Sequence, residues 1–284
     1  MRQFSINQSK TDAPMVYNSG QFKMKKYLFV LSALVLFVFS GCQKVAGDLI
    51  TKDFHVPGAY TELEVESAFD VTVSDAVDVI TITAGENVMP KVIVEVVENT
   101  LKIRLKPVAS VYGGELKAVI PYNVNLTSVD LSGASEFRSE YGLYGQKVEV
   151  ELSGASDFYC DIEANEIDMD ISGASHFTGT IDASDLDLDM SGASDATLRG
   201  QVTTLDLDLS GASSIKKTIN GSSYGFECDV CKGEMSGASD AYIHCNSIIK
   251  VNLSGSSDLH FTGAAFTADS NCTGGSNIIH DELP

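Results

Sequence analysis

The stretch SGASDF, residues 153–158, decides the fold of this chain because close copies of it recur throughout the second half. Successive copies are separated by 21, 19, 19, 19, 26, 18 and 19 residues. A steady period near 19 residues indicates a repeat architecture in which each repeat is one supersecondary unit. The first residues of the copies are Ser132, Ser153, Ser172, Ser191, Ser210, Ser236 and Ser254, followed by a weaker copy at Thr273.

The residues just before each first serine alternate between apolar and acidic side chains. In one copy, Val150 and Leu152 flank Glu151, and the other copies follow the same pattern with few exceptions. Because successive side chains of a strand point to opposite faces, the apolar columns face inward and the acidic column faces outward. The pattern predicts an all-β fold, a single parallel β-helix expected to be right-handed, with one coil of about 19 residues per repeat.

The organisation of the chain follows from this repeat. Residues 54–284 are predicted to form one β-helix domain, with less regular N-terminal coils over 54–125 and repeat coils over 126–280. Residues 43–53 are predicted to be a short tether. The 26-residue spacing requires an insertion, and the glycines of residues 219–226 predict a loop that protrudes from one corner.

The N-terminus carries an export signal. Residues 24–42 contain two lysines, an apolar run over 27–39 and small residues before Cys42, as in a bacterial lipoprotein signal with Cys42 lipidated. An ordinary cleaved signal or an uncleaved anchor are the alternatives. Residues 1–23 are interpreted as a start codon placed too far upstream. Gln43 is not the aspartate of inner-membrane retention, which favours the outer membrane, on either its surface or its periplasmic face.

The charge of the chain argues against a nucleic-acid partner. Removing residues 1–42 leaves 14 basic and 38 acidic residues, a net charge of −24. Nucleic-acid binding requires a basic patch, which this composition does not supply.

Three motifs taken in order resemble the auto-transporter adhesin "head GIN domain" family. They are Phe69-Asp-Val-Thr-Val-Ser, Glu98-Asn-Thr-Leu-Lys-Ile and Val129-Asp-Leu-Ser-Gly-Ala-Ser, and the resemblance covers roughly residues 54–280. It implies a secreted or lipid-anchored bacterial β-helix with a role in adhesion, and it brings no catalytic residues. The chain also lacks the Gly-x-Ser-x-Gly elbow and a base for each repeated serine, so we expect no enzyme.

The acidic columns are candidate cation sites. Asp168, Asp187 and Asp206 stand four residues before a first serine, and Asp170, Asp189 and Asp208 stand two before it. Carboxylates stacked about 4.8 Å apart repel by roughly 1 kcal/mol per pair in water. Ca²⁺, which accepts several carboxylate ligands, would relieve this repulsion. The alternative is a solvated face that keeps the sheet soluble.

The cysteines suggest a second site. Cys228 and Cys245 occupy similar positions in adjacent coils, which predicts a disulfide in an exported protein. The alternative is a zinc site made with Cys231 and His244. Cys231 and Cys272 fall on apolar columns and are predicted to be small core residues.

Exposed tyrosines are the candidate contacts for a glycan or protein ligand, chiefly Tyr141, Tyr144 and Tyr224. The sequence therefore predicts a non-enzymatic envelope lipoprotein, an adhesin or binding scaffold attached to the membrane by its lipid anchor. The alternatives are a carbohydrate-active β-helix enzyme, such as a polysaccharide lyase or hydrolase, and a passive structural protein of the envelope.

Overall fold

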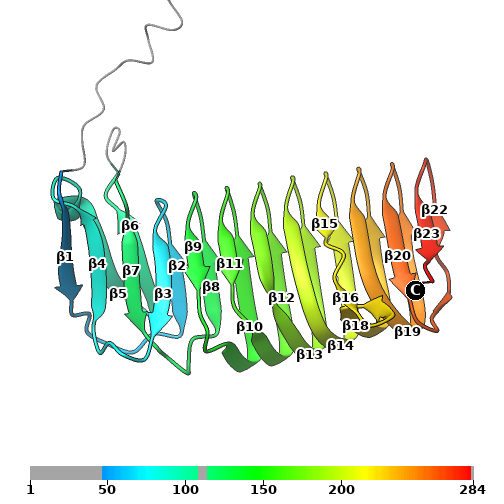
Figure 1. The fold of residues 1–284 in the computed structure, drawn as a ribbon, viewed down its shortest axis with the longest axis horizontal. Coiled ribbons are helices and arrows are strands. Elements are labelled where there is room, and N and C mark those ends of the chain that lie inside the picture. Colours follow the sequence, from blue (N-terminus) through cyan, green and yellow to red (C-terminus); the bar gives the residue numbers. More distant parts are fainter. Residues whose placement is uncertain (1–46, 108–113, 283–284) are drawn as a thin grey trace, which may run out of the picture. The chain divides into compact units, whose positions relative to one another are not determined.

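The computed structural model of the chain describes residues 47–107 and 114–282 (Figure 1). The predicted start region 1–23, the signal 24–42 and Cys42 lie outside these residues. The described residues form a β-solenoid of stacked parallel coils, which confirms the predicted fold class. Within this part of the chain no helix is long and apolar enough to cross a membrane.

The N-terminal part of the solenoid contains seven strands and one short 3-10 helix. They are β1 (Leu49–Phe54), β2 (Glu62–Val65), β3 (Asp70–Ser74), β4 (Ile80–Gly85), η1 (Met89–Lys91), β5 (Val92–Val97), β6 (Thr100–Leu105) and β7 (Lys117–Pro121). Strand β1 pairs antiparallel with β4, so the tether predicted for 43–53 is wrong from Leu49 onward. Its side chains are mostly exposed, so the burial pattern that marks the other strands is missing.

The repeat region continues the solenoid. Its strands are β8 (Ser128–Leu131), β9 (Glu136–Arg138), β10 (Leu143–Leu152), β11 (Asp157–Tyr159), β12 (Ile162–Ile171), β13 (His176–Met190), β14 (Asp195–Leu209), β15 (Ser214–Ile215), β16 (Ile219–Asn220), β17 (Ser223–Tyr224), β18 (Phe226–Met235), β19 (Asp240–Leu253), β20 (Asp258–Thr262), β21 (Phe266–Thr267), β22 (Asn271–Cys272) and β23 (Asn277–His280). Equivalent positions of the repeat are register partners, as in Val150 with Met169.

The order of the first coils in space differs from their order in sequence. Strands β2 and β3 pair with β6 and β7 on one side and with β8 and β9 on the other, always in parallel. The chain therefore makes the β2–β3 coil, continues through β4 and β5, and places the β6–β7 coil between β2–β3 and these outer strands. Beyond β6 and β7 the pairing becomes antiparallel, with β5 and β4 respectively.

The core is a stack of aligned side chains. Phe137, Phe158 and Phe177 are buried register partners whose ring centroids lie 5.1 and 5.3 Å apart. Each coil covers the apolar face of the previous one, because no single coil of this size could shield its own side chains from water. The predicted inward columns are therefore confirmed through the middle of the solenoid.

The SGAS phrase forms a corner. Gly192 has φ +78°, and a Cβ atom there would lie 2.4 Å from the carbonyl oxygen of Gly173 in the previous coil. The second serine of the phrase is buried, and its hydroxyl donates to the backbone carbonyl of the first, at 3.0 Å from Ser194 to Ser191. A hydroxyl committed to the backbone in this way closes the turn and is not exposed for chemistry.

Candidate functional site: an acidic groove and a tyrosine groove

The acidic column two residues before the serines forms one continuous ladder. The parallel register aligns seven carboxylates along the outside of successive coils. The first carboxylate, Glu64, forms an ion pair with Lys102 on the neighbouring strand β6. The ladder consists of Glu64, Asp130, Glu151, Asp170, Asp189, Asp208 and Glu234. It ends at Asn252 and Asn271. The three aspartates predicted from the sequence are thus the centre of a longer ladder.

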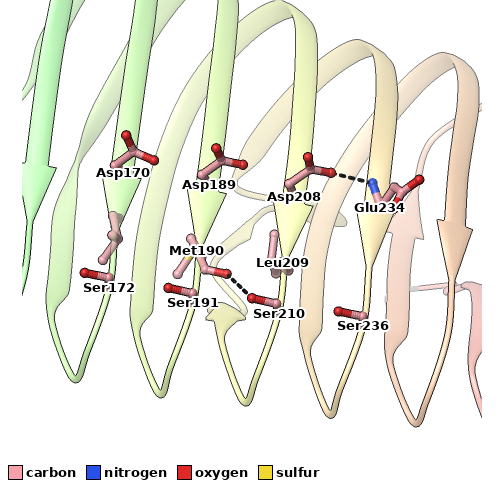
Figure 2. A pocket seen from close by; sticks show the side chains of 11 residues that line it. Asp170, Ser172, Asp189, Met190, Ser191, Asp208, Leu209, Ser210, Glu234 and Ser236 are labelled. Carbon is pink, nitrogen blue, oxygen red and sulfur yellow. Dashed lines mark hydrogen bonds between the residues drawn. The ribbon is translucent and has the colours of Figure 1, made fainter.

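Part of this ladder forms one wall of an open groove of about 420 Å³ (Figure 2). First serines from four coils, Ser172 to Ser236, line it beside the carboxylates. Within the groove the backbone N–H of Glu234 donates to Asp208 at 2.9 Å, and Ser210 donates to the Met190 carbonyl at 3.4 Å. The groove thus offers a row of carboxylates and hydroxyls that repeats with the spacing of the coils.

The second predicted column, four residues before the serines, forms ion pairs with two lysines that the sequence analysis missed. Lys147 lies 2.5 Å from Asp168, and Lys232 lies 2.6 Å from Asp206. Asp187 is the central carboxylate between these two pairs. Lys232 occupies the column position itself, so aligning the repeats of this chain could have shown that a lysine follows the three aspartates. Lys147 stands two residues before the column position of its own coil, and its side chain reaches across to Asp168 in the next coil.

The stacking raises the pKa of several carboxyls. For Asp187 and Asp189, loss of hydration beside the neighbouring coils raises the pKa, and the adjacent aspartates raise it further. The largest change is at Asp130, whose pKa rises to about 6 through partial burial and then through Glu151 and Glu64. Among the described residues, no group of three or more His, Cys, Asp or Glu side chains has the arrangement of a metal centre. The ladder is therefore an extended negative surface without a preformed chelating cage.

The second groove lies around residues 139–142. Two adjoining depressions, of about 460 and 340 Å³, share Ser139, Glu140 and Tyr159. Tyr141 lines one of them, and its hydroxyl donates to Asp75 at 2.8 Å while its ring lies 4.9 Å from that of Tyr122.

The tyrosine at the centre of this groove is held by an arginine. The Arg138 guanidinium lies 3.7 Å from the centroid of the Tyr159 ring, and Arg138 also pairs with Glu136. Hydroxyls of Thr178, Thr180 and Thr197 and the exposed Arg199 line the second depression. We call these two depressions together the tyrosine groove.

The other predicted tyrosines have different roles. Tyr144 is 45% exposed, and its hydroxyl lies against Gly142 without lining either depression. Tyr224 is buried, so the prediction of a ligand contact there is wrong. Residues 219–224 form the hairpin β16–β17, whose Tyr224 hydroxyl bonds with the Asp281 carboxylate and whose ring meets Tyr242 edge-on at 5.5 Å. The hairpin thus packs Tyr224 against later coils.

The cysteines occupy the positions predicted from the aligned repeats, except that Cys272 is not in the core. Cys228 and Cys245 are buried register partners, and both thiols are free in this structure. Hydrogen bonding to Cys228, together with burial, raises the pKa of the Cys245 thiol. Cys231 is buried as predicted, whereas Cys272 is exposed because its strand belongs to the last described coil and no other described residues cover that coil's outer edge.

These observations define the class of protein, which is a parallel β-solenoid with open lateral grooves. The chain belongs to the family described as "Putative auto-transporter adhesin, head GIN domain", whose model matches residues 59–265. No curated protein matches it.

Solved structures share the fold at low sequence identity. A "putative adhesin" from Parabacteroides merdae has a TM-score of 0.72 at 18% identity, covering 83% of this chain and 97% of its own. A "putative adhesin" from Parabacteroides distasonis has a TM-score of 0.68 at 19% identity, covering 83% and 95%. A "putative lipid binding protein" from the same organism has a TM-score of 0.69 at 16% identity, covering 83% and 98%.

Proposed function

We propose that this protein is a non-enzymatic adhesin of the bacterial cell envelope that binds carbohydrate in the tyrosine groove. The observation that carries the proposal is the groove itself, in which two half-exposed tyrosines stand beside hydroxyls and carboxylates. Aromatic faces with a few polar groups suit sugar rings, which present apolar C–H faces edged with hydroxyls. Membership of an adhesin family supports the role and a place at the cell envelope.

The acidic ladder has a supporting role in this proposal. Ca²⁺ held along the ladder would neutralise stacked carboxylates and bridge the sugar hydroxyls or carboxylates of a polymeric ligand. The raised pKa values of Asp187 and Asp189 favour this role, because they reflect the free-energy cost of keeping partly dehydrated carboxylates charged beside other aspartates. The lipid anchor at Cys42 and the outer-membrane location complete the proposal.

A glycan array tests the binding, with the protein applied in Ca²⁺ and again in chelator. For Tyr159→Ala we expect a loss of at least tenfold in affinity, about 1.4 kcal/mol. Tyr144→Ala is the matched control, since Tyr144 is exposed nearby but outside the groove, and it should bind as the parent does. Absence of glycan binding in both conditions, or equal losses in the two variants, would contradict the proposal.

Three further measurements separate the remaining alternatives. If Ca²⁺ acts through the ladder, Asp189→Asn should reduce the Ca²⁺-dependent part of binding and leave the rest. Turnover of a bound polysaccharide would contradict the adhesin proposal and support the alternative, a carbohydrate-active enzyme. Protease treatment of intact cells reports whether the solenoid is on the cell surface, and complete protection would rule out adhesion to external partners.

A further inference from the structure

The two ends of the solenoid are built differently. At the N-terminal end the chain folds over the core through β4, η1 and β5, so that Val88 and Met89 are buried there. At the C-terminal end the last coil consists of β21, β22 and β23, each paired only with the coil before it (Figure 1). Within the described residues, nothing hydrogen-bonds to the outer edge of these three strands.

The open end leaves apolar side chains in water. Phe266 is 61% exposed, and Cys272 is exposed although its partner one coil earlier, Leu253, is 2% exposed. Ile278 is half-buried, whereas its partner Leu259 is fully buried. The core columns of Leu253 and Leu259 thus continue to the surface at Cys272 and Ile278, whereas Phe266 continues the outward column of Ile248 and Val230.

The last coil lacks some of the usual defences of a free strand edge, although β21 and β22 have only two residues each and the exposed Asp269 lies between them. Proteins protect exposed edges with lysine, proline or bulges that prevent pairing with another chain. Residues 266–280 contain no lysine, arginine or proline. The four-residue strand β23 is therefore the longest free edge of this coil that can accept a partner strand.

The charge pattern changes at the same place. The acidic ladder ends at Glu234 and continues as Asn252 and then Asn271 on the last coil. In a second column, Asp240 and Asp258 are followed by Asn277, which donates to Asp258 at 2.8 Å. An amide carries both a donor and an acceptor and can therefore pair with its own copy, whereas stacked carboxylates repel.

We propose that the last coil, residues 266–282, is a docking surface for a second copy of this chain, joined end to end about a two-fold axis. Such an axis brings one edge onto itself with its strands antiparallel, so the free backbone groups of both copies can pair. The asparagines at this edge remove the repulsion that the acidic ladder would otherwise produce between two copies. One coil per partner is a small interface, so we expect a reversible dimer with Kd of about 1–100 μM.

Analytical ultracentrifugation over a range of concentrations tests this proposal, using the chain with Cys42→Ser to prevent lipidation. Asn271→Glu extends the acidic ladder to the edge and should weaken dimerisation at least tenfold, with recovery at high salt. Asn252→Glu is the matched control, because it makes the same change in the same column one coil inside the edge, and it should leave the dimer intact. Circular dichroism checks that both variants fold.

A thiol cross-linker with a short spacer gives an independent readout. Cys272 is exposed, whereas Cys160, Cys228, Cys231 and Cys245 are buried. A bismaleimide should therefore give a covalent dimer that Cys272→Ser abolishes. A parent chain that stays monomeric at millimolar concentration, equal effects of the two glutamate variants, or a dimer without a Cys272 cross-link would each overturn the proposal.

Discussion

Replacement of Gly192 by alanine should destabilise the protein far more than the same change at Gly221. Both glycines have positive φ, +78° and +61°, so an alanine at either position meets a similar backbone strain of about 1–2 kcal/mol. At Gly221 a Cβ atom meets nothing within 4 Å, whereas at Gly192 it would lie 2.4 Å from the Gly173 carbonyl oxygen. The pair of variants therefore separates the conformational strain from the stacking of the coils.

The additional cost at Gly192 follows from the hydrogen bonds at the corner. To relieve the contact the coil must move by nearly 1 Å, which disturbs the bond from Ala193 N–H to Gly173, now 2.7 Å. The Gly192 carbonyl also accepts from Ala212 in the next coil at 2.7 Å. At about 1 kcal/mol for each bond, Gly192→Ala should lose about 3–4 kcal/mol in all. Gly221→Ala should lose about 1–2 kcal/mol, and the stiffening of the unfolded chain reduces both losses equally.

Urea unfolding followed by circular dichroism measures this difference. Because each coil contacts only its neighbours, the Gly192 variant is expected to unfold in two steps that divide the solenoid near this corner. Gly192→Val adds a branched side chain to the same contact and should prevent stable folding. If Gly192→Ala proves no less stable than Gly221→Ala, the close stacking of the corners is not what requires glycine.

Three further predictions concern pH and the thiols. The pKa of Asp130 is about 6 in the folded protein and about 3.8 unfolded, so the protonated carboxyl stabilises the fold, and this contribution is present below about pH 4 and lost as pH rises through 6. In thermal unfolding, Asp130→Asn should therefore be more stable than the parent near pH 7, by roughly 1 kcal/mol of unfolding free energy after screening by solvent, and should match it near pH 4; a constant difference would contradict the assigned pKa. Of the five cysteines in the described residues, Cys272 alone is exposed, so it should be the one among them that reacts quickly with a thiol reagent in the folded, reduced protein. Material oxidised during export should show two fewer thiols after denaturation if Cys228 and Cys245 form the predicted disulfide, whereas an unchanged count would exclude it.

The repeat region could be predicted in detail because its information is local and repeated. The alternation around Glu151 assigns each side chain to one face of a strand, and the 19-residue period sets the register between coils. The acidic ladder follows directly from this register. The ion pair of Lys147 with Asp168 was missed because it depends on the length of the lysine side chain, and Lys147 does not stand in the aspartate column.

The tyrosine groove could not have been assembled from the sequence. Thr72 and Tyr159 are far apart in the chain and line one depression only because the β2–β3 coil is adjacent to the β8–β9 coil. The failed prediction for Tyr224 has a similar cause. A glycine-rich insertion indicates a loop, but whether that loop projects or packs against later coils depends on contacts such as Tyr224 with Asp281.

The sequence by itself determined the solenoid, its coil length, its inward and outward columns and the glycine corners, because a one-dimensional stack repeats the same nearest-neighbour contacts. Only the tertiary structure decided how the stack begins and ends. The insertion of the β2–β3 coil between β6–β7 and β8–β9, and the role of β1 as an edge strand, involve pairings between segments without a repeat. At the other end, Cys272 has the sequence position of a core residue, and it is exposed because its coil is the last one that the described residues form.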